Sequence, residues 1–377
     1  MKGHGRSGGR PTLEEVALRA GVGRGTVSRV VNGSPGVSAR TRTAVEAAVA
    51  ELGYVPHRAA RALAADRADA VALVVSDPQA PFFPGGSFVE VVRGVGAALA
   101  DTDVQLVLAL AGGERERRRL EGFLSGRRVD GVLLVAAGAG DPLPELLLRL
   151  GIPAVLGGCG AAAGTLPSVD CDDREGAAAA VRHLLERGRR AIAAITGPLD
   201  AYGDRRRLEG YRQALAAAGR PVDELLIAAG APTAEGGRQA VRELLERRPA
   251  LDAVFAACDP LAAGALAGLR AAGRRIPGDV ALVGFGDSAA ARYLDPPLTS
   301  VRQPGEEMGR AMARLLLERI EGGRGVEGAP GVEGEGPVVL PTRLVVRGSS
   351  WNVPGGGAGN AEGPGPLPRT GAFPQGE

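Results

Sequence analysis

The sequence is poor in the residues that build disulfide frameworks and metal centres. It has only three cysteines and three histidines among 377 residues, and Cys159, Cys171 and Cys258 show no CxxC spacing. An odd number of widely spaced cysteines predicts free thiols rather than a zinc site or a set of disulfides. We therefore expect no metal and no cofactor.

Long apolar runs are missing as well. No stretch approaches the roughly 20 apolar residues that a membrane-spanning helix needs, and the charged N-terminus is not followed by an apolar signal segment. We therefore expect a cytoplasmic, nucleoid-associated protein that has no membrane partner.

The usual signatures of catalysis are also lacking. The chain contains neither a GxxxxGK[ST] phosphate loop nor a GxSxG nucleophile motif. Residues 284–289 form a G-x-G-x-x-A string, but 292–298 interrupt the helix that should receive a pyrophosphate. His4, His57 and His183 lie far apart in the sequence. We therefore expect no enzyme; a hydride-transfer enzyme stays an alternative that stabilisation by NAD(P) would favour.

The charge of the chain is unevenly distributed. Residues 1–67 carry 11 Lys and Arg against 5 Asp and Glu, a net charge of +6, whereas the whole chain has +2 and the remainder therefore −4. A basic end on a mildly acidic body is typical of a protein that neutralises nucleic-acid phosphates with one domain.

Residues Thr12 to Asn32 have the pattern of two short amphipathic helices joined by a glycine-containing turn, as in a helix-turn-helix. Apolar residues repeat at helical spacing along the first helix: Leu13, Val16, Ala17 and Ala20. Gly21 is a stop signal, because glycine adopts the left-handed cap conformation without a Cβ clash. The apolar side of the second helix is formed by Val27, Val30 and Val31. A third helix is predicted from Ser38, a typical N-cap, to Leu52.

The strings TLEEVALRAGV, TVSRVVNG, VSARTR, ELGYVP and RAARALA occur in this order at the start of the chain. They resemble, at the same spacing, the N-terminus of the LacI/GalR family of bacterial transcription regulators, and the resemblance continues weakly to about residue 350. It implies a repressor that binds a pseudo-palindromic, double-stranded operator as a homodimer. It also implies a small-molecule effector, with a sugar or sugar derivative as the first expectation.

From residue 70 onward, apolar strand-like runs alternate with helical patterns, which predicts parallel sheets covered on both faces. The expected strands are 71–76, 104–110, 131–136, 154–157, 191–196, 225–228, 253–257, 280–285 and 338–344. The fold class is thus an all-α helix-turn-helix headpiece plus an α/β domain of doubly wound parallel sheets. The resemblance implies that this domain has the two lobes of a type I periplasmic-binding protein, with chain crossings near 188–190, 298–302 and 336–340.

These patterns divide the chain into five parts. We expect a disordered tail (1–10), a helix-turn-helix DNA-binding domain (11–56), a hinge helix or linker (57–68), a two-lobed effector-binding and dimerisation domain (69–350) and a second disordered tail (351–377).

The second helix of the headpiece carries the predicted base readers. Arg24 can pair bidentately with guanine, and Arg29 matches a base-contacting arginine of the family. Side chains that are expected to bind phosphates or cap helices are Thr26, Ser28, Asn32, Ser38 and Thr41, and Tyr54 is a further DNA-binding candidate. The resemblance implies that Leu63 enters the minor groove from the hinge, with Arg58 and Arg61 near phosphates. The alternatives are a solvated or phosphate-bound Arg24 and a plain interdomain linker.

In the family the effector binds between the lobes. The matching residues here are Phe82, Phe83, Arg207 and Asp259, and Asp287 is a fifth candidate because it lies next to a position where many members have an aspartate. Two of them have simpler alternatives: a surface salt bridge for Arg207 and helix N-capping for Asp259. The chain also departs from the family pattern, with Gly286 at a frequent aspartate position, Cys258 at an amide position and Pro232 at an aromatic position. A DNA-binding regulator with a degenerate cleft and no effector therefore stays an alternative.

Alanines fill the hinge between residues 58 and 65, and alanine is the strongest helix former. We predict that this hinge is partly helical before DNA binds, which would weaken control by an effector. Backbone NMR shifts of the free protein test this, and shifts of a random coil at 58–65 would refute it.

Overall fold

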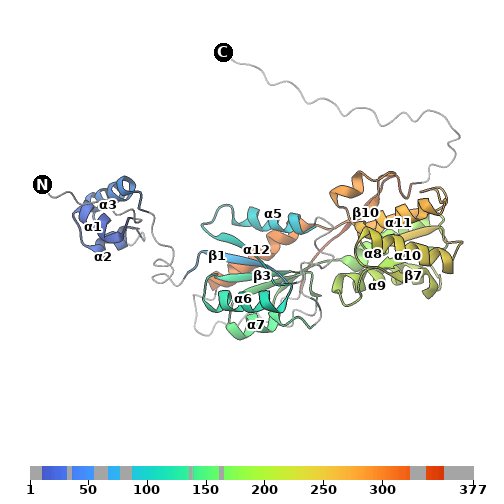
Figure 1. The fold of residues 1–377 in the computed structure, drawn as a ribbon, viewed down its shortest axis with the longest axis horizontal. Coiled ribbons are helices and arrows are strands. Elements are labelled where there is room, and N and C mark those ends of the chain that lie inside the picture. The colour runs from blue at the N-terminus through green and yellow to red at the C-terminus, as the bar shows by residue number, and fades with distance from the viewer. Residues whose placement is uncertain are drawn as a thin grey trace, which may run out of the picture.

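The computed structural model describes residues 11–31, 36–54, 67–76, 87–135, 138, 140–160, 165–322 and 337–351. They form a helical headpiece and two α/β lobes (Figure 1), which confirms the predicted fold class. In the part of the chain described, no helix is long and apolar enough to cross a membrane. The predicted tail at 1–10, all of the predicted tail at 351–377 except Trp351, and most of the predicted hinge lie outside the described residues.

The headpiece consists of α1 (Leu13–Ala20), α2 (Arg24–Val31) and α3 (Ala39–Leu52). Thr12 caps α1: its hydroxyl accepts from the backbone N–H of Glu15, whose carboxylate accepts from the Thr12 backbone. Gly21 ends α1 with φ of 65°, as predicted. The three helices share one small core, whose buried members are Val16, Ala17, Val27, Val30, Val45, Ala48 and Tyr54.

The first lobe is a six-stranded, parallel sheet with helices on both faces. Its strands lie in the order β11 (Val338–Leu340), β5 (Ser168–Cys171), β4 (Ala154–Gly157), β3 (Gly131–Val135), β1 (Ala70–Val75) and β2 (Gln105–Leu110). One face is covered by α5 (Ser87–Leu99) and α12 (Gly305–Gly322), the other by α6 (Glu114–Ser125) and α7 (Leu143–Leu150).

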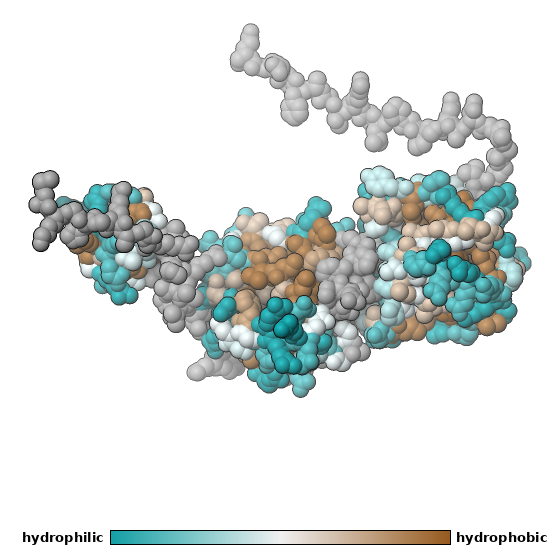
Figure 2. All heavy atoms as spheres, in the orientation of Figure 1, coloured by the Kyte–Doolittle hydropathy of each residue, from teal (hydrophilic) through white to brown (hydrophobic). Residues whose placement is uncertain are grey.

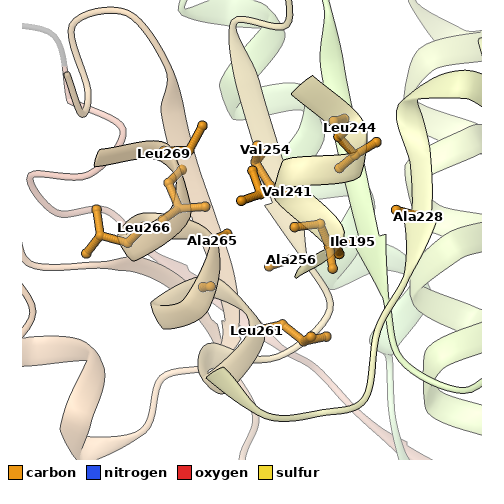
Figure 3. Packing of buried hydrophobic residues seen from close by; sticks show 14 of the residues in the cluster. Ile195, Ala228, Val241, Leu244, Val254, Ala256, Leu261, Ala265, Leu266 and Leu269 are labelled. Carbon is orange, nitrogen blue, oxygen red and sulfur yellow. The ribbon is translucent and has the colours of Figure 1, made fainter. Parts of the chain in front are cut away.

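The second lobe has a sheet of the same size. Its order is β12 (Arg343–Val345), β10 (Thr299–Arg302), β9 (Ala281–Gly286), β8 (Ala253–Ala256), β6 (Ile192–Thr196) and β7 (Ile227–Ala229), and only the β10–β12 pair is antiparallel. The covering helices are α8 (Asp173–Glu186), α9 (Tyr202–Ala217), α10 (Ala234–Arg247) and α11 (Asp259–Ala271). Figure 3 shows side chains of α10 and α11, such as Val241 and Leu261, packing near those of the sheet.

The chain crosses between the lobes three times, but not everywhere that we predicted. The first crossing follows β5 at residue 172, because α8 already packs on the second sheet; the prediction of 188–190 was wrong. The second crossing lies at 303–304, between β10 and α12, just after the predicted 298–302. The third lies at 341–342 and divides the predicted strand 338–344 into β11 and β12 of different sheets.

Neighbouring helices approach closely where glycine removes the side chain. A methyl group on Gly94 of α5 would overlap the backbone oxygen of Glu306 in α12, and one on Gly309 of α12 would overlap that of Val91 in α5. The pairs α8·α9 and α10·α11 have the same device, at Gly210, Gly237 and Gly264. These contacts lock the helices in pairs, because packed backbones have no side chain that can adapt.

We predict that Gly94→Ala destabilises the protein by about 1–3 kcal/mol, because the new methyl group forces α5 away from α12. Gly96→Ala is the matched control: Gly96 lies in the same helix with open space around it, so alanine should stabilise it by about 0.5–1 kcal/mol. Urea unfolding measures both. Equal effects of the two substitutions would contradict the close packing of these helices.

Candidate functional site

Helix α2 presents a basic, polar surface because its valines are turned inward. Val27 and Val30 are buried in the headpiece core, whereas Arg24 and Arg29 are exposed. The Arg24 guanidinium lies 3.0 Å from the Glu14 carboxylate, and its side chain is 73% exposed. An exposed ion pair of this kind contributes little, so Arg24 can leave it for another partner.

The other predicted DNA contacts differ in their surroundings. Thr26 and Ser28 are half-buried on α2. Ser38 caps α3 by accepting from the backbone N–H of Thr41 at 3.3 Å, and the two hydroxyls are 2.9 Å apart. Tyr54 is only 9% exposed and packs in the headpiece core, so its ring stabilises the headpiece.

Six predicted site residues lie outside the described residues: Asn32, Arg58, Arg61, Leu63, Phe82 and Phe83. Their roles stay predictions.

The predicted effector arginine, Arg207, is buried on α9 at the carboxyl end of the second sheet. Its guanidinium donates to Asp173 at 2.9 Å, to the backbone oxygen of Ala257 at 3.1 Å and to Asp204 at 3.4 Å. It also lies over the ring of Phe285, 4.4 Å from the centroid. The surface salt bridge considered for this arginine is therefore excluded, because the structure places it in a buried network.

The electrostatics of this network follow from burial and pairing. Burial alone would lower the pKa of Arg207, but Asp173 and Asp204 outweigh it and raise the pKa. Burial raises the pKa of both aspartates, and Arg207 opposes that rise. The arginine Nε is buried and has no hydrogen-bond partner among the described residues, so one donor of the fork is left unused.

Asp259 is the first residue of α11 and joins three elements. Its carboxylate accepts from the backbone N–H of Ser288 and from the Ser300 hydroxyl, each at 2.6 Å. Burial raises its pKa, and these hydrogen bonds oppose the rise. The N-cap of α11 is Cys258, not Asp259, so the capping alternative for Asp259 was wrong; the carboxylate instead ties α11 to β10 and to the loop after β9.

Asp287 is fully buried and paired with two arginines. Its carboxylate is 2.7 Å from Arg302 Nε and 2.6 Å from Arg347 Nη2. The preceding Gly286 has φ of 118°, a backbone conformation that residues with a Cβ rarely adopt. An effector that binds Asp287 would first have to displace one of these arginines. The effector-binding role of Asp287 stays a prediction.

Cys258, where an amide is common in the family, is a neutral thiol in this environment. It is 7% exposed, and burial raises its pKa to about 12. Among the described residues no group of three or more His, Cys, Asp or Glu could hold a metal ion.

Sequence reasoning missed several residues at the junction of the lobes. Gln303, in the second crossing, donates to Asp173 at 2.9 Å. Tyr202, at the start of α9, packs against Gly160 after β4 so closely that a methyl group there would overlap the ring. Asp170 accepts from the Gly160 N–H at 3.1 Å. The one sequence signal for Asp170 and Asp173 is their position at the end of strand β5, and β5 was not predicted.

Comparison with known proteins gives two family matches. Residues 12–57 match the model for bacterial regulatory proteins of the lacI family, and residues 181–350 match a periplasmic binding protein-like domain. The chain is 50% identical over 342 residues to the HTH-type transcriptional regulator CelR of Thermobifida fusca, which covers 90% of this chain and 98% of that protein. It is 34% identical over 312 residues to the ribose operon repressor of Escherichia coli K12, with 82% and 93% covered.

Solved structures agree with these matches. A transcriptional regulator CelR–cellobiose complex superposes with a TM-score of 0.68 at 48% identity, covering 90% of this chain and all of that one. The lac repressor dimer bound to operator and the anti-inducer ONPF superposes with a TM-score of 0.78 at 26% identity, covering 91% and 100%.

Proposed function

The chain belongs to the LacI family of bacterial regulatory proteins and is a DNA-binding transcriptional regulator, and we propose that cellobiose or a closely similar disaccharide controls its affinity for operator DNA. The observation that carries this proposal is the 50% identity to CelR over 98% of the length of that protein. The cellobiose complex in the comparisons supports the chemical class of the effector.

Arg24 and Arg29 are our proposed base readers. Both are exposed on α2, whose buried valines fix which side faces outward. The basic charge of residues 1–67 supports binding to phosphates. Because operator DNA lies in the bacterial cytoplasm, we place the protein there, at the nucleoid. The relatives named above are regulators rather than enzymes, which supports a function by DNA and effector binding without catalysis.

We propose that the protein binds its operator as a homodimer through the first lobe. Strand β2 is an edge strand whose outward side chains Leu108 and Leu110 are 52% and 49% exposed, and Val89 on the neighbouring helix α5 is 61% exposed. Figure 2 shows an apolar area on this lobe. Exposed apolar edge strands favour association with another chain, and the similar lac repressor structure is a dimer bound to operator.

For the effector we propose a site around Arg207. Its buried guanidinium is held in place by Asp173 and Asp204, and a planar fork recognises oxygen atoms of a sugar well. A regulator of the same fold that takes no effector is the second candidate, because Gly286, Cys258 and Pro232 depart from the family pattern.

We predict that Arg24→Ala weakens binding to an operator selected from random duplexes by about 5- to 150-fold for each half-site, because each subunit of the homodimer loses one bidentate guanine contact of ~1–3 kcal/mol. The loss of sequence discrimination should be confined to one base pair in each half-site. Fluorescence anisotropy with base-substituted duplexes measures it. Uniform weakening across all sequences with a smaller salt dependence would instead mean that Arg24 contacts phosphate.

We predict that cellobiose at 100 times its Kd stabilises the full-length protein by about 2.7 kcal/mol and changes operator affinity, whereas maltose, which differs in its linkage, does neither. Thermal shift and anisotropy measure these effects. Arg207→Lys should abolish the response. Arg212→Lys is the control and should retain it, because Arg212 lies on the same helix as Arg207 but forms only an exposed ion pair with Glu224. No response to any sugar would favour the regulator without an effector.

A further inference from the structure

Asp173 stands between the proposed effector arginine and the segment that joins the two lobes. One carboxylate oxygen accepts from Arg207 at 2.9 Å, and the other accepts from the Gln303 side-chain amide at 2.9 Å. We propose that Asp173 is a positioning residue that couples Arg207 through Gln303 to α12, and so transmits occupancy of the cleft to the first lobe. This inference rests on the proposed function and names the route of its regulation.

The three crossings are joined to each other at this point. The backbone N–H of Asp172 donates to Leu340 at 2.9 Å, and its backbone oxygen accepts from the Thr342 hydroxyl at 3.2 Å. The first crossing is thereby bound to the third, and Asp173 binds it to the second. A change at Asp172–Asp173 therefore reaches every covalent connection between the lobes.

Gln303 is continuous with the rigid part of the first lobe. Its backbone oxygen accepts from the N–H of Gly305, the first residue of α12, at 3.0 Å. Within α12, Met308 and Met312 are buried against Gly157 of β4, and Gly309 contacts the backbone of α5. A close-packed helix shifts as one piece, so displacement of Gln303 would move α12 relative to its own sheet or carry the whole lobe with it.

The link is stiff because it is buried and charged. The side chains of Asp173 and Arg207 are 9% and 11% exposed, and Asp204 occupies another face of the guanidinium. If Arg207 turns towards a ligand, Asp173 must follow or leave a buried charge without its partner, which is far more costly than the movement. Gln303 must then follow Asp173 or lose its acceptor.

The first experiment breaks only the arm between Asp173 and the crossing. Gln303→Leu removes the donor while Arg207 and Asp173 keep their contact; Gln213→Leu, the same change at an exposed position of α9, is the control. Anisotropy gives the operator Kd with and without saturating cellobiose. We expect the ratio of the two constants to fall about fivefold in Gln303→Leu, the loss of one hydrogen bond, and to stay unchanged in Gln213→Leu.

Two outcomes would overturn the proposal. One is an unchanged ratio in Gln303→Leu. The other is a loss of cellobiose affinity that is common to the operator-free and the operator-bound protein. Linkage makes the measured ratio equal to the ratio of these two affinities, so a common loss would mean that Gln303 contacts the ligand itself. A wild-type protein that ignores cellobiose would refute the proposed function alone.

A second experiment needs no effector. Hydrogen exchange of the amides of residues 305–309 is compared in the wild type, Arg207→Lys, Gln303→Leu and the double variant. Lysine cannot keep the forked contacts, so Arg207→Lys should accelerate exchange at the start of α12, and it should have no such effect in the Gln303→Leu background. If Arg207→Lys leaves these amides unchanged, or changes them equally in both backgrounds, the coupling route is wrong.

Discussion

The second lobe depends on how it neutralises one buried arginine. Arg207 lies where β6, β8 and β9 end, and it bonds to Asp173, Asp204 and the backbone of Ala257 while its flat face covers Phe285. A buried guanidinium without these partners would cost several kcal/mol. The constraint therefore fixes the start of α8, the first turn of α9 and the end of β8 relative to one another, and it gives the proposed effector site a preformed wall.

The same balance of charge limits which ligands the proposed effector site can bind. Four buried aspartates (Asp173, Asp204, Asp259 and Asp287) lie at this edge of the lobe, and three of them are paired with Arg207, Arg302 and Arg347. Within this described network the arginines therefore do not outnumber the aspartates. A phosphorylated or carboxylated ligand would bring a further negative charge into a site of low dielectric. A neutral sugar, with hydroxyl groups that both donate and accept, fits these surroundings, in agreement with the proposed disaccharide.

The sequence predicted the parts of the fold that periodicity can reveal. The apolar stripes of α1, α2 and α3 and the caps Ser38 and Gly21 were read correctly, and so were the long apolar strands. Strands β5 (SVDC) and β10 (TSVR) were not predicted because they are short and polar at one end. The first crossing was predicted at the wrong place because it directly follows β5. The candidate site was predicted only in part, and Arg207 was found by resemblance. Its contact with Asp173 joins residues 34 positions apart, and the contact of Asp173 with Gln303 joins residues 130 positions apart. No local sequence pattern encodes such distant contacts.

Rigid lobes and a hydrogen-bonded junction together determine where this molecule can change shape. Glycines bring the backbones of the two helices into direct contact in the pairs α5·α12, α8·α9 and α10·α11. The helices of each pair therefore resist movement relative to one another. The crossings at 172, 303–304 and 341–342 contain only a few residues, and hinges are short segments that absorb changes of backbone angle. Because Asp172 and Asp173 bind all three crossings to one another, a rotation of the lobes about one crossing alone would break hydrogen bonds to the other two. Any closure around a ligand must rearrange the junction as a whole, which is the property that a two-state switch requires.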